Sequence, residues 1–376
     1  MKITIDATGL SPFRTGTVTY LLEILARWAA VAVPLHQFVI FCTPQTRHHF
    51  EELQSDRRFT LALVSRNKLM QMLWQQTFLP LYLWRHKIDV HWGPGFILPL
   101  VKVCPMAVTI HDMTFESLPE VHEPIKRVYF PFMIRRALGR ADMVFAVSRS
   151  TANDVQRLIP GGARRIAVTY LAPRTPVNDQ VTKLQHKSVN RTLPISDSVT
   201  KPYVLFVGTL EPRKNLERLL AAWRELPVEV CDKYHLKVIG VKGWMVDQLE
   251  QQSNDTVEVL GHVSDAALDS YLSNATCFAY PSLYEGFGLP VIEAMAAGIP
   301  VLTSNVGATR EIAEGAAVLV DPRSVDSIQA GLAKLLSEPD LRRELSEAGL
   351  NRAAQFSWAQ TAQATWQALE NIASPT

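Results

Sequence analysis

The chain has 376 residues, 47% hydrophobic and 20% charged, which predicts about two domains and excludes a disordered or fibrous protein. The net charge is +2, but residues 1–175 hold 21 Lys and Arg against 12 Asp and Glu (net +9), and the remainder holds 17 against 24 (net −7). This asymmetry indicates different partners for the two halves. An anionic membrane surface or a phosphorylated acceptor would suit the basic half, and no recognised motif supports nucleic-acid binding.

The cysteines and the N-terminus favour a cytoplasmic protein. The cysteines are scattered, without metal-ligand or disulfide spacing, which predicts reduced thiols. Residues 2–6 enter a strand pattern directly, which predicts no signal peptide. The longest apolar run, residues 95–110, contains Lys102 and two prolines and is therefore not a membrane span.

The first half alternates strand and helix patterns. A strand over residues 2–6 leads into a loop ending at Gly16, which either approaches a phosphate through its backbone or is a plain turn residue. A helix follows over about 17–30. Further strands are expected over residues 37–43, 61–64, 88–91, 107–110, 143–148 and 166–170.

Three features of this half bear on function. The Leu-, Met- and Trp-rich segment 67–84 predicts one helix that belongs to the core. His111 follows a buried strand, where open α/β sheets bind ligands, although a structural role is equally open. A helix ending near residue 140 interleaves basic and aromatic residues, which suits either a membrane interface or an ordinary solvated helix.

Residues 173–201 are polar and aperiodic, which indicates a linker, and the strand–helix alternation then restarts. We expect strands over 203–207, 236–239, 257–260, 276–279 and 301–303, and helices over 216–223, 243–252, 265–273, 290–297, 325–336, 340–355 and 358–372. Both halves thus predict α/β domains with parallel sheets and helices on both faces.

The stretch 280–321 holds the strongest candidate site. A glycine-containing turn precedes a helix that Pro290 opens and Gly298 ends. Glu285 lies before this helix and Glu293 lies one turn inside it. A helix N-terminus attracts phosphate, and two flanking carboxylates would bind diols, so the pattern suits a sugar nucleotide. The alternative is an ordinary turn with two surface glutamates.

The loop GTLEPRKN, residues 208–215, places Arg213 and Lys214 after the first strand of the second half. Arginine binds phosphate through paired N–H groups, and lysine acts as a point charge. A solvated surface pair is the alternative.

These motifs together resemble the retaining family 4 glycosyltransferases of the GT-B fold. The resemblance covers nearly the whole chain and is most specific in residues 208–215 and 281–312, with support from segments 6–20, 91–95, 108–115, 147–155 and 242–244. It implies two Rossmann-like doubly wound parallel-sheet domains facing a cleft. The implied parts are residues 1–175, a linker over 176–200, a nucleotide-sugar domain over 201–355, and a final helix over 356–376 that crosses back to the first domain.

The resemblance also implies roles for residues. The residues implied to be catalytic are Glu285 at the donor sugar, Arg213 and Lys214 at the diphosphate, and His111 at the sugar's primary hydroxyl and reacting face. Those implied to bind the donor are Gly16, Thr209, Val263, Gly286, Phe287, Gly288, Leu289 and Glu293, with Glu293 at the ribose diol and the backbone near Val263 at the base. Several relatives carry Arg where Thr209 stands, and a second glycine where Thr17 stands.

The resemblance favours the bacterial mannosyltransferases of surface-polysaccharide or O-antigen synthesis, with GDP-mannose as donor and a lipid-linked saccharide as acceptor. It implies no cofactor and no metal, front-face attack, and a peripheral location on the inner face of the plasma membrane. A UDP- or dTDP-sugar donor, a sugar-nucleotide epimerase or phosphorylase on the same fold, and a non-catalytic nucleotide-binding module are the alternatives. A nicotinamide dehydrogenase is disfavoured, because the G-x-G-x-x-G fingerprint is absent.

Overall fold

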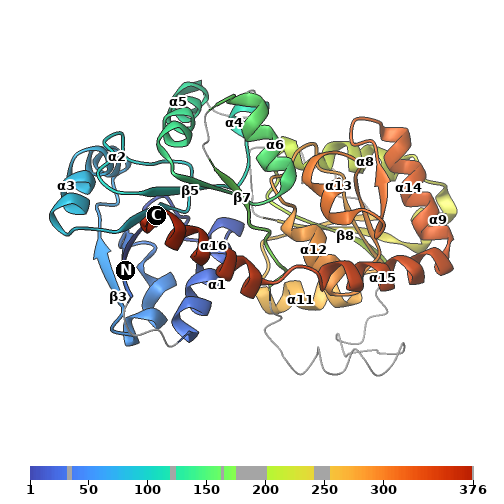
Figure 1. Cartoon of the computed structure of the whole chain (residues 1–376). Helices are drawn as coiled ribbons and strands as arrows, with labels where there is room; N and C mark the ends of the chain where they lie inside the picture. The colour runs from blue at the N-terminus through green and yellow to red at the C-terminus, as the bar shows by residue number, and fades with distance from the viewer. Residues whose placement is uncertain (32–35, 119–123, 162–164, 175–200, 241–254, 375–376) are drawn as a thin grey trace. The chain divides into compact units, whose positions relative to one another are not determined.

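The computed structural model describes residues 1–31, 36–118, 124–161, 165–174, 201–240 and 255–374. The chain divides into two compact units, unit 1 (Met1–Leu171 with Ser357–Thr376) and unit 2 (Ala172–Phe356). Each unit is built on one parallel sheet (Figure 1). The predicted linker over 176–200, the predicted helix over 243–252 and the supporting motif at 242–244 lie outside the described residues.

Unit 1 contains a seven-stranded parallel sheet. Its strands are β1 (Lys2–Asp6), β2 (Gln37–Cys42), β3 (Phe59–Leu63), β4 (Val90–Gly93), β5 (Met106–Ile110), β6 (Met143–Ala146) and β7 (Ile166–Val168). They lie in the order β3-β2-β1-β4-β5-β6-β7, so the direction of sheet growth reverses beside β1. In doubly wound sheets, ligands bind at the carboxyl ends of the strands at such a reversal.

Helices cover this sheet. They are α1 (Gly16–Ala30), η1 (Arg47–Ser55), α2 (Lys68–Gln76), α3 (Phe78–Arg85), α4 (Thr114–Ser117), α5 (Pro124–Arg140), α6 (Arg149–Leu158) and the C-terminal α16 (Trp358–Ala373). Figure 1 shows α16 beside α1, and the indole Nε1 of Trp28 donates a hydrogen bond of 3.0 Å to the carbonyl of Ala362. The end of the chain therefore completes the core of unit 1.

The prediction of one core helix over residues 67–84 is wrong in two respects. Two helices occupy the segment, α2 and α3, with Thr77 between them. Pro80 explains the break, because proline cannot donate to the carbonyl of Gln76 and its ring clashes with that carbonyl in a continuous helix. Many of the apolar side chains on these helices are also exposed rather than in the core.

Unit 2 contains a six-stranded parallel sheet. Its strands are β8 (Tyr203–Val207), β9 (His235–Ile239), β10 (Val257–Gly261), β11 (Cys277–Tyr280), β12 (Val301–Ser304) and β13 (Ala317–Val320), in the order β10-β9-β8-β11-β12-β13. β13 was not predicted, because a four-residue apolar run resembles the end of a helix as much as an edge strand. The order reverses beside β8, so the ends of β8 and β11 form the expected binding edge.

The described helices of unit 2 are η3 (Pro212–Lys214), α8 (Leu216–Arg224), α9 (Val228–Lys233), α11 (Asp265–Asn274), α12 (Leu289–Ala296), α13 (Gly307–Ala313), α14 (Val325–Ser337) and α15 (Pro339–Ala353). The two parallel sheets confirm the predicted fold class of two doubly wound α/β domains. The four cysteines are free. Among the described helices, none combines the length and the apolar character needed to cross a bilayer.

Candidate active site

The loops after β8 and β11 are joined to each other. The backbone N–H of Leu283 donates to the carbonyl of Arg213 at 2.8 Å. Asn215 Nδ2 donates to the carbonyls of Pro281 at 2.8 Å and Pro322 at 2.6 Å. Asn215 adopts the left-handed conformation, with φ of 62°, which asparagine tolerates better than most residues. These bonds bring the cations of the first loop to the carboxylate of the second.

Glu285 lies at the centre of an ion cluster. Its Oε1 lies 2.6 Å from Lys214 Nζ, 2.9 Å from Tyr280 Oη and 2.8 Å from Ser282 Oγ. Its Oε2 accepts a hydrogen bond of 3.0 Å from Arg213 Nη1. Glu285 is only 8% exposed and Lys214 only 7%, so the interpretation of Glu285 as a surface glutamate is wrong.

The cluster fixes the protonation of the Glu285 carboxyl. Burial alone would raise its pKa, but the charges of Lys214 and Arg213, with hydrogen bonds from Lys214 and Ser282, outweigh burial and lower the pKa to about 2. Burial lowers the pKa of Lys214, and Glu285 opposes that shift. Burial, together with the nearby Glu285 charge, raises the pKa of Tyr280 well above its ordinary value. Glu285 is therefore an anion at neutral pH, and Tyr280 is a neutral hydrogen-bond donor.

Arg213 is shared between two carboxylates. Its Nε donates to Glu211 Oε2 at 2.8 Å, while its Nη1 binds Glu285. The two cations and two carboxylates together carry no net charge when all are ionised. Lys214 also contacts Glu285, at 2.6 Å. A diphosphate would therefore bind beside two cations that are already oriented and whose charges are neutralised by Glu211 and Glu285.

α12 opens beside this cluster. It begins at Leu289, one residue before the predicted start, and Gly288 at its N-cap has φ of 97°, a conformation that favours glycine. The first N–H groups of a helix have no acceptor within the helix and attract anions. The helix ends at a Schellman motif, in which Gly298 N donates to Met295 O and Ile299 N to Ala294 O.

Glu293 belongs to a second charge cluster. Its Oε1 lies 3.3 Å from Arg174 Nε, and the other guanidinium nitrogens of Arg174 lie 3.6 Å from Asp265 and 3.2 Å from Asp269. Burial raises the pKa of Glu293, Arg174 opposes the shift, and Asp269 adds to it. Glu285 and Glu293 thus have unlike surroundings.

The remaining residues of unit 2 that are predicted to bind the donor lie in the loops after β8, β10 and β11. Thr209 is exposed in the loop after β8, and Val263 is half-buried before α11. Gly286 is buried beside Glu285. The Phe287 side chain is 4% exposed and packs edge-on against Phe356 at 5.7 Å, so it belongs to the core.

In unit 1, His111 and Gly16 are linked through α1. Gly16 is the first residue of α1, and Tyr20, one turn later, packs edge-on against the His111 ring with centroids 5.0 Å apart. His111 Nε2 lies 2.8 Å from the carbonyl of Pro94, which can only accept, so Nε2 carries a proton and Nδ1 is the acceptor of the neutral ring. Loss of hydration lowers the pKa of His111, which favours the neutral form.

Sequence reasoning missed six residues of unit 2 that the structure places in the clusters: Tyr280, Ser282, Glu211, Arg174, Asp265 and Asp269. Tyr280 and Ser282 flank the end of a strand, which could have indicated them. Arg174 offered no signal, since it lies far from Glu293 along the chain. Among the described residues, no group of three or more His, Cys, Asp or Glu side chains has the arrangement to hold a metal ion.

Comparison with known proteins assigns the family. Residues 14–172 match the family model described as Glycosyltransferase Family 4, and residues 194–352 match the one described as Glycosyl transferases group 1. The chain is 31% identical over 382 residues to O-antigen chain mannosyltransferase B of Escherichia coli, with 95% of this chain and 96% of that protein covered. The chain belongs to the family 4 glycosyltransferases.

Further comparisons agree with this assignment. This glycosyltransferase is 27% identical over 251 residues to the O-antigen chain mannosyltransferase RfbU of Salmonella typhimurium, covering 65% of this chain and 64% of that protein. The structure of sucrose-phosphate synthase from Thermosynechococcus elongatus superposes with a TM-score of 0.75 at 21% identity, covering 99% of this chain and 98% of that one. At that identity the likeness shows the fold alone, which is GT-B.

Proposed function

We propose that this glycosyltransferase moves mannose from GDP-mannose to a lipid-linked saccharide, with retention of anomeric configuration and without a metal ion. The observation that carries the proposal is the buried, ionised Glu285 held between Lys214 and Arg213 beside the N-terminus of α12. Similarity to O-antigen chain mannosyltransferases supports mannose as the sugar and a growing saccharide as the acceptor.

The cations and the helix act on the leaving group. When the bond between the sugar C1 and the phosphate oxygen breaks, negative charge grows on the diphosphate and positive charge on the sugar ring. Arg213, Lys214 and the first N–H groups of α12 are oriented before the reaction, so they stabilise the growing charge without reorganising. Protein groups would thus do the work that a metal ion does in other transferases.

Glu285 acts on the sugar. Because Oε1 already accepts from three donors, a sugar hydroxyl would donate to Oε2. The anion would also stabilise positive charge on the ring. Glu285 is not proposed as a nucleophile: the acceptor hydroxyl attacks C1 from the face that the phosphate leaves, its proton passes to the leaving phosphate oxygen, and GDP is released.

The remaining assignments are part of the same proposal. Glu293 would accept hydrogen bonds from the ribose diol, and the backbone near Val263 would bind the base. His111 would accept from the sugar's primary hydroxyl through Nδ1, since its Nε2 proton is donated to Pro94. Gly16 would contribute its N–H at the start of α1 to the phosphates. The acceptor would place the enzyme at the cytoplasmic face of the inner membrane.

A thermal-shift screen of GDP-, UDP- and dTDP-sugars, followed by NMR of the products, tests the proposal. We expect GDP-mannose to raise Tm most, an α-mannoside to form, and chelation of divalent cations to leave the rate unchanged. Glu285→Ala should abolish transfer and leave GDP affinity largely intact. A free epimer without glycoside would instead assign an epimerase, and nucleotide binding without turnover would assign a binding module.

A further inference from the structure

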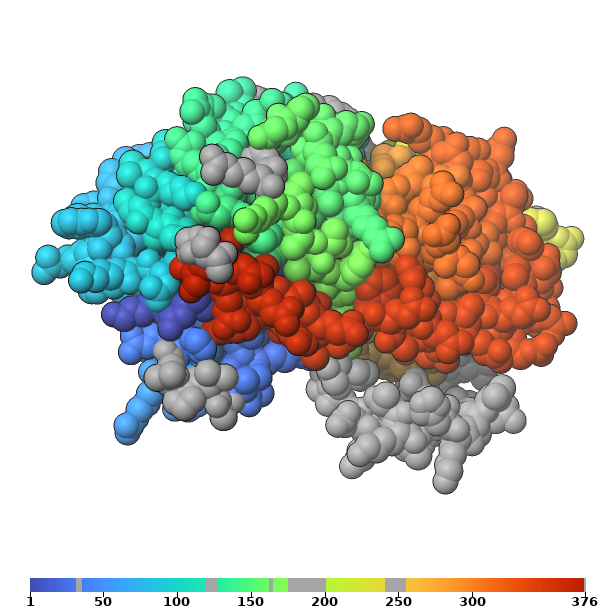
Figure 2. Space-filling model, viewed as in Figure 1, coloured from blue at the N-terminus to red at the C-terminus, as the bar shows by residue number. Residues whose placement is uncertain are grey.

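α2 and α3 present an apolar surface to solvent. Six large side chains, each between 51% and 68% exposed, form what we call the α2–α3 face: Leu69, Met70, Leu73, Phe78, Leu81 and Trp84. These helices, labelled in Figure 1, form part of the light-blue surface in Figure 2. A contiguous exposed apolar patch on a folded protein marks an interaction site.

Both helices pack on the same strand of the sheet of unit 1. Their inner sides meet at one residue of β2: the Phe41 ring lies 4.8 Å from the Trp74 ring of α2 and 5.2 Å from the Tyr82 ring of α3. Because both inner stripes pack on the same strand, the opposite stripes form one surface. The exposure is thus a consequence of how the helices dock on the sheet.

The loop before β5 extends this surface. Leu100 N donates to the side-chain oxygen of Gln76, at the end of α2, at 2.8 Å. Leu100, Val101 and Val103 are themselves exposed. Lys102 lies among them, but its ammonium pairs with Asp142, so the loop extends the apolar surface without adding uncompensated positive charge.

The surroundings of the face are basic. Residues 59–88 contain no Asp or Glu and four cations, which are Arg66, Lys68, Arg85 and Lys87. Lys68 begins α2, Arg85 ends α3, and both are exposed. An apolar stripe with tryptophan, bounded by basic residues, is the pattern of helices that lie in the headgroup region of a bilayer.

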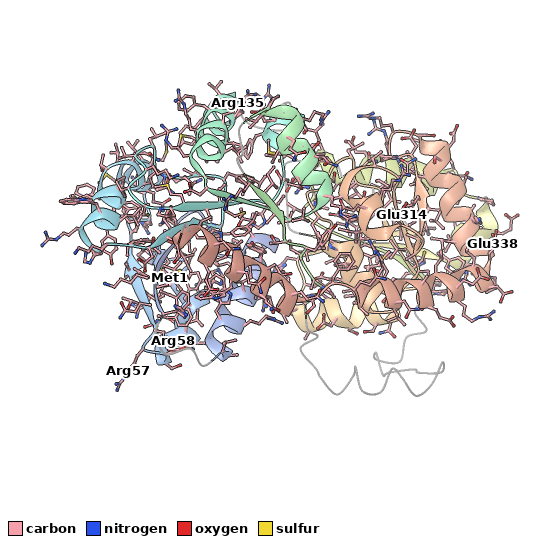
Figure 3. All side chains as sticks on the ribbon, in the orientation of Figure 1. Met1, Arg57, Arg58, Arg135, Glu314 and Glu338 are labelled. Carbon is pink, nitrogen blue, oxygen red and sulfur yellow. The ribbon has the colours of Figure 1, made fainter. Side chains whose placement is uncertain are left out.

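The sequence pattern suits α5 either as a membrane-interface helix or as an ordinary solvated helix, and its described arginines make contacts within the protein. Arg135, labelled in Figure 3, forms two hydrogen bonds of 2.9 Å with Glu116. Arg136 lies over the Phe132 ring at 5.1 Å, and Arg140 donates to the carbonyl of Leu100. The α2–α3 face combines apolar exposure and positive charge more fully.

We propose that the α2–α3 face docks this enzyme on an anionic lipid surface, with Phe78, Leu81 and Trp84 entering the boundary between headgroups and acyl chains. A second copy of the chain is a poorer occupant, because a two-fold interface would bring the cations around the face against one another. The inference deepens the proposed function, since docking would hold the enzyme in the plane of a lipid-linked acceptor.

Co-sedimentation of the full chain with vesicles tests the docking without donor or acceptor. The wild type should bind phosphatidylcholine vesicles that contain phosphatidylglycerol and bind pure phosphatidylcholine much more weakly. Phe78→Ser with Trp84→Ser should weaken binding about tenfold or more. Lys68→Glu with Arg85→Glu should weaken vesicle binding about fivefold for each cation lost. Added salt should weaken the binding of the wild type to anionic vesicles.

Matched controls come from unit 2. Val228→Ser with Leu350→Ser removes two exposed apolar side chains, and Lys233→Glu with Arg323→Glu makes the same change in charge; both should bind like the wild type. Circular dichroism and thermal unfolding establish that each variant is folded. Sedimentation velocity without lipid reports any self-association.

Three results would overturn the docking: equal wild-type binding to neutral and anionic vesicles, unchanged binding by the folded Phe78 and Trp84 variant, or a wild-type dimer that this variant converts to a monomer. The last would assign the face to a second copy. The two proposals fail separately, because glycoside formation on a water-soluble acceptor reports transfer and vesicle binding reports docking.

Discussion

Arg174 Nε lies 3.3 Å from Glu293 Oε1. This ion pair joins a residue near the start of unit 2 to α12, the helix that begins beside the ion cluster of Glu285. Asp269 and Asp265 lie within 4 Å of the same guanidinium, so Arg174 forms ion pairs with three carboxylates. Without it, Glu293 would be a poorly hydrated carboxylate beside two like charges. Arg174 is therefore the residue that keeps Glu293 available as an anion.

Arg174→Ala should weaken GDP binding, and more so at low pH. The pKa of Glu293 is already above its ordinary value, and removing the guanidinium raises it further, so the carboxylate protonates as pH falls. We expect about a tenfold loss of affinity near pH 6 and a smaller loss near pH 8, measured by calorimetry. Arg174→Lys keeps the charge and should retain most of the affinity. An equal loss at both pH values would contradict this role.

Glu211→Gln should tighten GDP binding. Glu211 competes for the guanidinium of Arg213, so neutralising it frees positive charge for the diphosphate. Because Glu211 is partly exposed, the expected gain is only about threefold in Kd, and it should shrink as salt is added. Glu217→Gln removes an exposed carboxylate from the adjacent α8 and serves as the control. Weaker binding by Glu211→Gln would show that Glu211 mainly orients Arg213.

Glu285→Gln should destabilise unit 2 in a pH-dependent way. The pKa of Glu285 is lowered from 4.5 to about 2, so its contribution is present above about pH 4.5 and is lost as pH falls towards 2. The shift corresponds to about 3 kcal/mol of the free energy of unfolding at neutral pH. Urea unfolding should show this difference at pH 7 and a smaller one in acid.

Glu314→Gln is the control for that measurement. Glu314, labelled in Figure 3, is an exposed carboxylate of the same unit, and its replacement should change the free energy of unfolding little at any pH. A pH-independent loss in Glu285→Gln would mean that the charge of Glu285 contributes nothing beyond packing.

Gly240→Ala should destabilise unit 2 by about 2 kcal/mol or more, as measured by thermal unfolding. A Cβ at this position would lie 1.9 Å from the carbonyl oxygen of Gly208, so the loop that leads to Arg213 would have to move. Gly139→Ala in α5 is the contrasting substitution, because a Cβ there meets no atom within 4 Å. It should stabilise α5 by up to about 1 kcal/mol.

The fold class, and the placement of Glu285, Arg213 and Lys214 in one site, could be predicted from the sequence because both follow from order along the chain. Strands such as Tyr203–Val207 and Cys277–Tyr280 are short apolar runs. Glu285, Arg213 and Lys214 all lie just after such strands. Once the two strands are neighbours in a parallel sheet, their carboxyl ends coincide and the three charges meet.

Features that depend on packing between distant parts of the chain could not be predicted from the order of residues. Arg174 meets Glu293 only through tertiary structure. Hydrophobicity also cannot tell which side of a helix packs on the sheet, so Trp84 looked like a core residue although it is 68% exposed. The left-handed Asn215 and its bonds to two separate loops likewise have no signature in a single sequence.

The bonds that Asn215 and Leu283 form between the loops have a thermodynamic consequence. They hold Arg213 and Lys214 against Glu285, so these side chains have lost much of their rotational freedom through contacts within the protein. Nucleotide binding therefore requires little further loss of conformational entropy in these loops. The calorimetric entropy of GDP binding should accordingly be dominated by the release of water and the immobilisation of the nucleotide itself.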